Sequence, residues 1–109
     1  MPVPDQVVGG VRLMSDYSSE WPLWIGNVNV TADHLGLSSA LACRLWDWER
    51  HFDTHHNHKS GWDSEPAREW YANQAEALFR DLRTELSPDV ALALDVWPLG
   101  AAKDPDSID

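Results

Sequence analysis

The chain has 109 residues, which is enough for one domain with a single modest core. Eighteen Asp and Glu residues against eight Lys and Arg residues give a net charge of -10, which repels phosphate backbones and disfavours direct binding to nucleic acid. No apolar stretch is long enough to cross a membrane and no signal peptide is visible, so we expect a cytoplasmic protein without a membrane partner. The single cysteine, Cys43, excludes an internal disulfide, and its apolar surroundings predict a small buried side chain.

The first predicted element is a strand that begins at Val11. From there the alternation places Val11, Leu13 and Ser15 on one face and more polar side chains on the other. The aromatic segment SSEWPLWIGN follows, in which a proline prevents a regular central strand and a Gly-Asn pair marks a turn. A short second strand at residues 28–30 would complete a hairpin-like start, and residues 31–36 predict one helical turn.

The clearest signal in the chain is an amphipathic helix that begins at Ser38 or Ser39 and runs to about residue 54. Serine is a preferred residue at the N-cap of a helix. The apolar stripe of this helix consists of Leu41, Leu45, Trp48 and Phe52. The charged residues, Glu49 among them, are predicted to lie away from the stripe or at its flanks. The helix should therefore pack its Leu/Trp/Phe face on an apolar surface.

A second helix is predicted to be capped by Asp63 or Ser64 and to carry Pro66 in its first turn, where proline is tolerated. Its apolar stripe consists of Ala67, Tyr71, Ala75, Leu78, Leu82 and Leu86. The Ser-Pro pair at residues 87–88 should end it. Two helices joined by a linker of this length are expected to lie antiparallel.

The alternating run VALALDVW, residues 90–97, predicts a last strand with one strongly apolar face. The small, polar and acidic tail at residues 100–109 is expected to be disordered, which leaves residues 1–99 as a single domain. The order of elements predicts an α+β fold: a small two- to three-stranded sheet with two antiparallel helices packed on one face, in the order β-(β)-α-α-β. The first and last strands should pair with each other.

Residues 51–63, HFDTHHNHKSGWD, allow two interpretations. In the first, His51 and His55 lie one helical turn apart, and His58 or Asp63 completes a three-ligand site for zinc or another transition metal. The protein would then be a metal-binding module or a metal-dependent enzyme. In the second, the helix ends here, because histidine is favourable in a last turn, and the polar residues that follow form an exit loop without any cofactor.

Seven tryptophans are many for a chain of this length, and each large ring needs a partner for its indole N–H where it is buried. We expect at least two of them to be partly exposed, which is typical of binding surfaces. Acidic residues flank several of these rings, a pattern that suits an acidic, aromatic binding face; rings that only close the core would give the same pattern. The predicted partner-binding residues are Asp16, Glu20, Trp21, Trp24, Asp47 and Asp53.

Three stretches of the chain, DYSSEWPLW, LGLSSALACRLWDWERHF and LRTELSPD, carry a resemblance to known proteins. Together they resemble small, acidic, uncharacterised bacterial single-domain proteins that have a D-Y-x-x-x-P-L-W-like segment and a Trp-rich helix. The similarity extends over residues 11–97. Small acidic proteins of this size are often immunity proteins or antitoxins, so the resemblance implies a plug for a basic toxin domain and supplies no catalytic residues.

We therefore expect a non-enzymatic binding protein, an immunity protein or antitoxin, that neutralises a basic toxin or effector domain. Its carboxylates would speed the encounter with the partner and its tryptophans would anchor the complex. The metal-dependent alternative at residues 51–63 stays open. So does the oligomeric state, since the apolar strand at residues 90–96 would suit a homodimer as well as a monomer.

Overall fold

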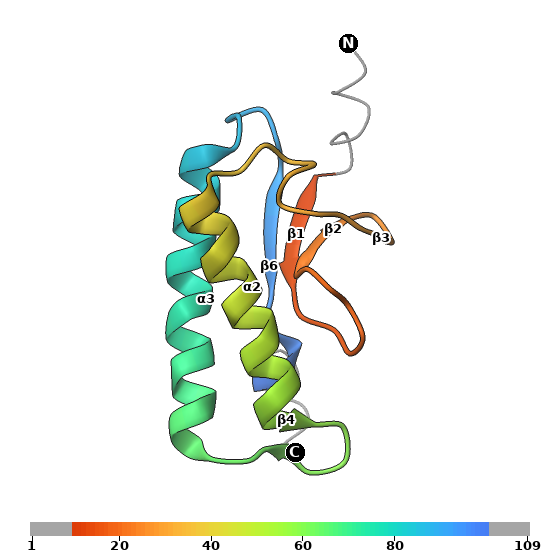
Figure 1. Cartoon of the computed structure of the whole chain (residues 1–109), viewed down its shortest axis with the longest axis vertical. Coiled ribbons are helices and arrows are strands. Elements are labelled where there is room, and N and C mark those ends of the chain that lie inside the picture. The colour runs from red at the N-terminus through yellow and green to blue at the C-terminus, as the bar shows by residue number, and fades with distance from the viewer. Residues whose placement is uncertain (1–9, 101–109) are drawn as a thin grey trace.

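The computed structural model describes residues 10–100, and the predicted disordered tail lies, apart from Gly100, outside them. The described chain forms two layers, a four-stranded sheet and two long helices that lie side by side across one of its faces (Figure 1). A small two-stranded hairpin closes the end at which the first helix stops. The predicted α+β class, with a sheet and two helices, is confirmed.

The sheet contains β1 (Val11–Met14), β2 (Leu23–Ile25), β3 (Val28–Asn29) and β6 (Leu92–Asp95) in the order β3-β2-β1-β6. Consecutive strands β1, β2 and β3 are antiparallel, whereas β1 and β6 run parallel. The predicted pairing of the first and last strands is thus confirmed. Because parallel neighbours need a crossover connection, the two helices are the link that carries the chain back to the start of β6.

Strand β1 follows the predicted alternation. Leu13 is fully buried and pairs with the equally buried Leu23 of β2, both beneath the helices. Arg12 and Trp24, the neighbouring pair in the register, therefore lie on the opposite face of the sheet. The sheet has one covered and one open face.

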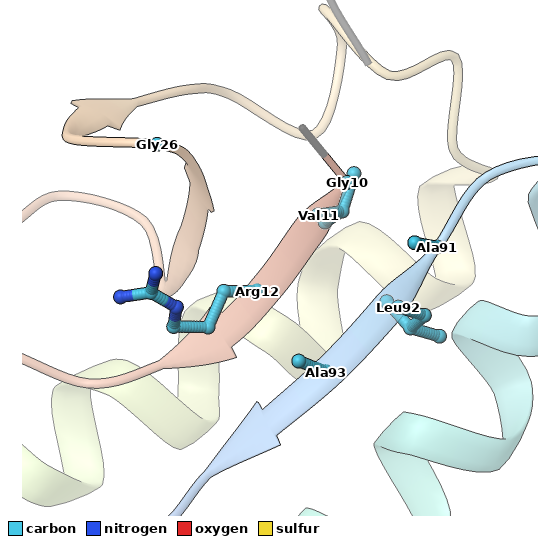
Figure 2. Close-up of a pocket in the computed structure, with 7 residues that line it drawn as sticks. All are labelled: Gly10, Val11, Arg12, Gly26, Ala91, Leu92 and Ala93. Atoms are coloured by element: carbon cyan, nitrogen blue, oxygen red, sulfur yellow. The ribbon is translucent and has the colours of Figure 1, made fainter. Parts of the chain in front are cut away.

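The open face has a shallow hollow between β1 and β6 (Figure 2). It exists because the side chains there are small: Ala91 stands next to Gly10, and Ala93 lies opposite Arg12. Gly10 has a φ of +84°, and a Cβ built on it would lie 3.0 Å from the Cβ of Ala91. Glycine is therefore required where these two parts of the chain meet.

The helices α2 (Ser39–His55) and α3 (Glu65–Glu85) start where the capping residues predicted. The Ser38 hydroxyl accepts the N–H of Leu41, and the Ser64 hydroxyl accepts the N–H of Ala67. Such a serine cap stabilises a helix by about 1 kcal/mol. Within residues 10–100, no helix is both long and apolar enough to span a membrane.

The core lies between the helices and the covered face of the sheet. Its centre is the pair Trp48 and Tyr71, whose rings stack with centroids 4.4 Å apart and planes 11° apart. Both side chains are fully buried, and the indole N–H of Trp48 donates to the carbonyl of Tyr71 over 3.0 Å. Each large buried side chain of this kind contributes roughly 1.5–3 kcal/mol, so the stripes read from the sequence hold the two layers together.

The linker between the helices is more ordered than predicted. Instead of a plain polar loop it contains a hairpin of β4 (His56–Asn57) and β5 (Gly61–Trp62). The Asn57 side chain accepts the N–H of Lys59 over 2.7 Å and so closes the turn. Hydrophobic periodicity cannot predict a hairpin whose strands have only two residues each.

The last strand is shorter than predicted, since β6 ends at Asp95 and the 3-10 helix η1 (Trp97–Leu99) follows. Proline at position 98 cannot donate to a strand ladder, which favours the change. The prediction for Cys43 is wrong, because its side chain is exposed. Cys43 lies two residues after Leu41 and two before Leu45, and so faces away from the stripe that these leucines form.

Candidate functional site

The seven tryptophans fall into two groups according to what their indole N–H groups contact. Four of them donate to a backbone carbonyl at 2.7–3.0 Å: Trp24, Trp48, Trp62 and Trp97. Trp21, Trp46 and Trp70 make no such bond to any described residue, and all three are half-buried or exposed. The expectation that at least two tryptophans are partly exposed is confirmed. The indole N–H groups of these three rings have no acceptor in the described chain and could bond to a partner.

Trp21 and Trp46 form a pair, with ring centroids 5.2 Å apart in a T-shaped arrangement. Trp21 and Trp46 line a groove made of two hollows, which share Trp21 and Ala42 in their walls, while Trp46 belongs to one of them. We call it the Trp21 groove; the residues that matter below are Trp21, Asp33, Ala42, Cys43, Trp46 and Asp47. Aromatic walls with water-exposed edges suit the burial of a partner's side chain.

The charged residues of the Trp21 groove are acidic. Asp33 lines one hollow and Asp47 the other, and both are exposed. Neither forms an ion pair with another residue of the described chain. The neighbouring cations on α2 are engaged elsewhere: Arg44 forms an ion pair with Asp81, and Arg50 lies with its guanidinium carbon 4.2 Å from the centre of the Trp46 ring and forms an ion pair with Asp53. The carboxylates of the groove are therefore left without a counter-charge.

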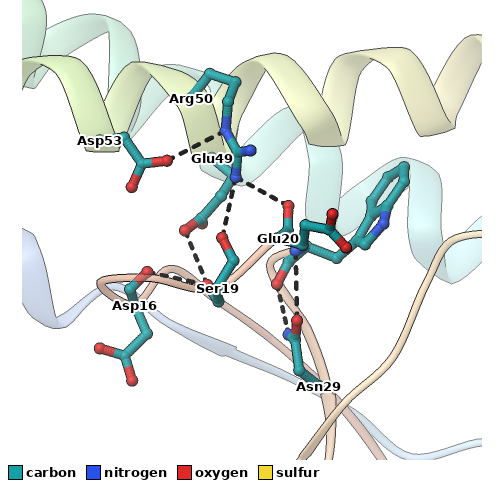
Figure 3. A network of polar contacts seen from close by, with 8 residues as sticks. Asp16, Ser19, Glu20, Asn29, Glu49, Arg50 and Asp53 are labelled. Carbon is teal, nitrogen blue, oxygen red and sulfur yellow. Dashed lines mark hydrogen bonds and ion pairs between the residues drawn. The ribbon is translucent and has the colours of Figure 1, made fainter.

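The loop that carries Trp21 is held from two sides, as Figure 3 shows. From α2, Arg50 donates through Nη2 to the carbonyls of Ser19 and Glu20 over 3.0 and 2.9 Å. From β3, the Asn29 amide donates to the Trp21 carbonyl over 2.6 Å and accepts its N–H over 3.4 Å. Since the backbone on both sides of the ring is fixed, Trp21 is presented in one position and little conformational entropy would be lost on binding.

Arg50 also meets Asp53, with Nε 3.2 Å from Oδ2, although the N–H does not point along a hydrogen bond to that oxygen. The contact is an ion pair between half-exposed side chains. Burial raises the pKa of the Asp53 carboxyl, and the Arg50 charge partly offsets that rise. Asp53 therefore balances Arg50 and is not a free carboxylate.

Glu49, predicted to lie away from the apolar stripe or at its flanks, has a fully buried side chain. Its position explains this: it follows Leu45 by four residues and precedes Phe52 by three, so it lies on the stripe itself. Burial raises the pKa of Glu49 to about 7, while the hydroxyls of Ser19 and Ser15 partly counter the rise. Its Oε1 has no hydrogen-bond partner in the described chain.

Ser19 links Glu49 to the turn at Asp16. Its Oγ lies 2.9 Å from both the Asp16 carbonyl and the Glu49 Oε2 (Figure 3). A serine hydroxyl has one proton, so Ser19 donates either to the Asp16 carbonyl or to Glu49 Oε2; while it serves the carbonyl, only a protonated Glu49 can complete the other bond. Burial is the cause of the raised pKa of Glu49, and it outweighs the Ser19 hydrogen bond, which by itself lowers that pKa.

The structure divides the predicted binding residues. Trp21 and Asp47 border the groove, and Glu20 stands next to Trp21 with an exposed side chain. Trp24 lies on the open face of the sheet, where its N–H donates to Met14. Asp16 accepts the N–H of Tyr17 over 2.8 Å and stays in its own turn.

Sequence reasoning left Asp33, Ala42 and Trp46 out of the predicted binding set. The signal for Trp46 is present in the sequence, because Trp46 stands one position outside the apolar stripe of α2, which indicates that a large ring there faces away from the core. For Asp33 and Ala42 no local signal exists, since they reach the groove only through the fold.

The histidine-rich segment serves the packing of the hairpin. The His51 ring lies between those of His55 and Trp70, at 4.5 and 4.3 Å, and its Nε2 is 2.9 Å from the Ala67 carbonyl. His55 Nδ1 lies 2.9 Å from Asp63 Oδ2. In residues 10–100 no group of three or more His, Cys, Asp or Glu side chains is placed to hold a metal ion.

His58 lies apart from His51 and His55, with its ring 6.2 Å from that of Tyr17. His56, which the metal interpretation did not use, contacts the Tyr17 hydroxyl with Nδ1 over 2.7 Å. Its ring packs 5.1 Å from Phe52 and 5.0 Å from Trp62, and burial lowers its pKa. A neutral His56 thus joins the aromatic cluster that fastens the hairpin to the end of α2.

Comparison with known proteins places the chain in a family. Residues 9–94 match the model of a family described as Serratia CdiI immunity protein-like. No curated protein matches the chain. The family match covers most of the chain: it includes both long helices and all six strands, apart from the last residue of β6. The resemblance to immunity proteins drawn from the sequence is confirmed, and the chain belongs to the Serratia CdiI immunity protein-like family.

Proposed function

We propose that this immunity protein neutralises a basic toxin domain by binding it through the Trp21 groove and the carboxylates beside it. Proteins of its family are immunity proteins, whose partners are toxins. The protein acts by occupying a surface of the toxin, so its work is binding and involves no reaction. Trp21 and Trp46 serve as the anchors of the complex, and Glu20, Asp33 and Asp47 speed its formation.

The observation that supports this proposal is that the polar groups of the Trp21 groove lack partners within the described chain. Two adjacent rings with free indole N–H groups stand beside carboxylates that have no counter-charge in the described chain. Tryptophan is enriched among the residues that contribute most to binding energy, and complementary charge raises association rates. The net charge of -10 extends the attraction for a basic partner to the whole molecule.

The anchoring role is tested by Trp21→Ala, with Trp70→Ala as the matched control. Trp70 is also exposed and also has a free indole N–H, but it lies against His51, away from the groove. Calorimetric titration with the purified cognate toxin domain should show that Trp21→Ala weakens binding by about tenfold or more, and that Trp70→Ala has little effect. The reverse pattern would move the toxin-binding surface to the histidine-rich end of the molecule.

The electrostatic role is tested by Asp47→Lys, with Glu76→Lys on the exposed side of α3 as the control of equal charge change. Stopped-flow association with the same toxin domain should be slower for Asp47→Lys than for the control, and the difference should shrink as salt is added. Equal association rates for the two variants would refute the steering role of the groove while leaving the anchoring role open to its own test.

A further inference from the structure

The hollow at the Trp46 side of the groove has a shape and a chemistry of its own. Its walls are Trp21, Ala42, Cys43, Trp46 and Asp47, and its volume is about 240 Å³. Pockets for small molecules commonly measure roughly 300–1,000 Å³, so this one suits a single side chain better than a free metabolite. Four of its walls are apolar or aromatic and one is a carboxylate. The occupant must therefore combine a flat or apolar body with a positive charge.

We propose that this hollow receives one arginine side chain of the toxin, whose guanidinium packs against the Trp21–Trp46 pair and forms an ion pair with Asp47. The inference rests on the proposed function and specifies the chemistry of the partner at that site. Arginine fits better than lysine, because a planar, weakly hydrated guanidinium both stacks on indole rings and bonds a carboxylate with two N–H groups.

The protein already contains one example of this contact. The Arg50 guanidinium lies 4.2 Å from the centre of the Trp46 ring, so the ring accepts a guanidinium in the same surroundings. Arg50 does not compete for the hollow, because its Nη2 is engaged by the Ser19 and Glu20 carbonyls. Its charge is balanced by Asp53 at 3.2 Å, which leaves Asp47 available for a cation from outside.

The decisive experiment is a double-mutant cycle in the complex with the cognate toxin domain. Each toxin arginine is replaced in turn by Lys and by Gln, and every variant is titrated against the wild type, Asp47→Asn and Trp46→Leu. At one arginine position, the toxin variant should bind more weakly even when the replacement is Lys. The effects on affinity of replacing that arginine and of replacing Asp47 should be coupled by about tenfold or more, as for close charge pairs across interfaces. If no toxin arginine couples to Asp47 or Trp46, the inference is overturned.

A second measurement fills the hollow without touching a charge. Ala42 lies in its wall, whereas Ala40 on the same helix is exposed and lines neither hollow. Ala42→Leu should weaken toxin binding by about tenfold while Ala40→Leu leaves it unchanged, and thermal unfolding of both variants shows whether they remain folded. Equal binding by a folded Ala42→Leu would show that the hollow stays empty in the complex.

The two proposals fail in different ways. Suppose that Trp21→Ala binds the toxin weakly, whereas Ala42→Leu binds normally and Asp47 couples to no toxin arginine. That result would support the toxin-binding groove and refute the bound arginine. A toxin that binds Trp21→Ala and Asp47→Lys as well as it binds the wild type would remove the groove itself, and the arginine with it.

Discussion

The burial of Glu49 makes the stability of the protein depend on a single proton. The side chain is fully buried, which disfavours the ionised carboxylate, and the hydrogen bond from Ser19 offsets only part of that cost. The pKa of Glu49 is raised to about 7 from 4.5, which corresponds to about 3 kcal/mol in favour of the neutral form. The group is neutral in the folded state over a range of pH in which it is ionised in the unfolded chain.

The first prediction follows from the sign of that shift. Because the folded pKa is above the unfolded one, the contribution of Glu49 is fully present below about pH 4.5 and is lost as the pH rises through 7. Glu49→Gln keeps a donor for Ser19 and does not titrate. Urea unfolding should therefore show that Glu49→Gln gains stability relative to the wild type between pH 5 and pH 8, by up to about 3 kcal/mol.

The control for this prediction is Glu76→Gln, since Glu76 is exposed on α3. Its unfolding free energy should differ from that of the wild type by nearly the same small amount at both pH values. A difference between Glu49→Gln and the wild type that does not change with pH would mean that Glu49 keeps one protonation state throughout.

At the level of single residues, the sequence predicted the burial of apolar side chains better than the partners of polar groups. Leu41, Leu45, Trp48 and Phe52 are buried as their spacing requires. Glu49 also falls beside these residues, but the sequence did not predict that it is fully buried, because its hydrogen-bond partner Ser19 comes from a distant loop. The sequence does not show which tryptophans have a hydrogen-bonded indole N–H, because the carbonyl that accepts such a group comes from another part of the fold.

At the level of elements, helix α2 acts as the support of the Trp21 loop. The second prediction is that Arg50→Lys loosens this loop, because an ammonium group cannot bond two carbonyls and stack on Trp46 in the way that a planar guanidinium does. Amide hydrogen exchange in residues 16–21 should become several-fold faster, in line with a local loss of about 1 kcal/mol.

Arg80→Lys, on the exposed side of α3, is the matched control, and exchange in residues 16–21 should stay at the wild-type rate. If Arg50→Lys also leaves those rates unchanged, the Asn29 amide is sufficient to hold the loop.

Elements defined by local signals were predictable, and elements defined by distant contacts were not. Both helix starts follow from Ser38 and Ser64, whose hydroxyls bond within three residues. The β4–β5 hairpin depends instead on His56, which packs against Tyr17 and Trp62. The predicted groove was incomplete for the same reason, since α2 and the loop after β3 meet at Trp21 only in the folded chain.

At the level of the whole molecule, one continuous core joins both helices to the sheet, from Val11 to Val90. The third prediction is that the described fold unfolds in a single transition. Urea curves from tryptophan fluorescence and from far-ultraviolet circular dichroism should share one midpoint, because no part has a core of its own. Fluorescence that changes before the dichroism would reveal that the loop and hairpin detach from an intact helix pair.

The parallel pairing of β1 with β6 also limits when the sheet can form. Val11 pairs with Leu92, so the strand at the centre of the sheet lacks one neighbour until nearly all of the described chain has left the ribosome. Contacts between such distant residues slow folding, since a long loop must close before they form. The sheet can accordingly be completed only after both helices have been synthesised, and a chain that stopped before β6 would leave one side of β1 without its partner strand.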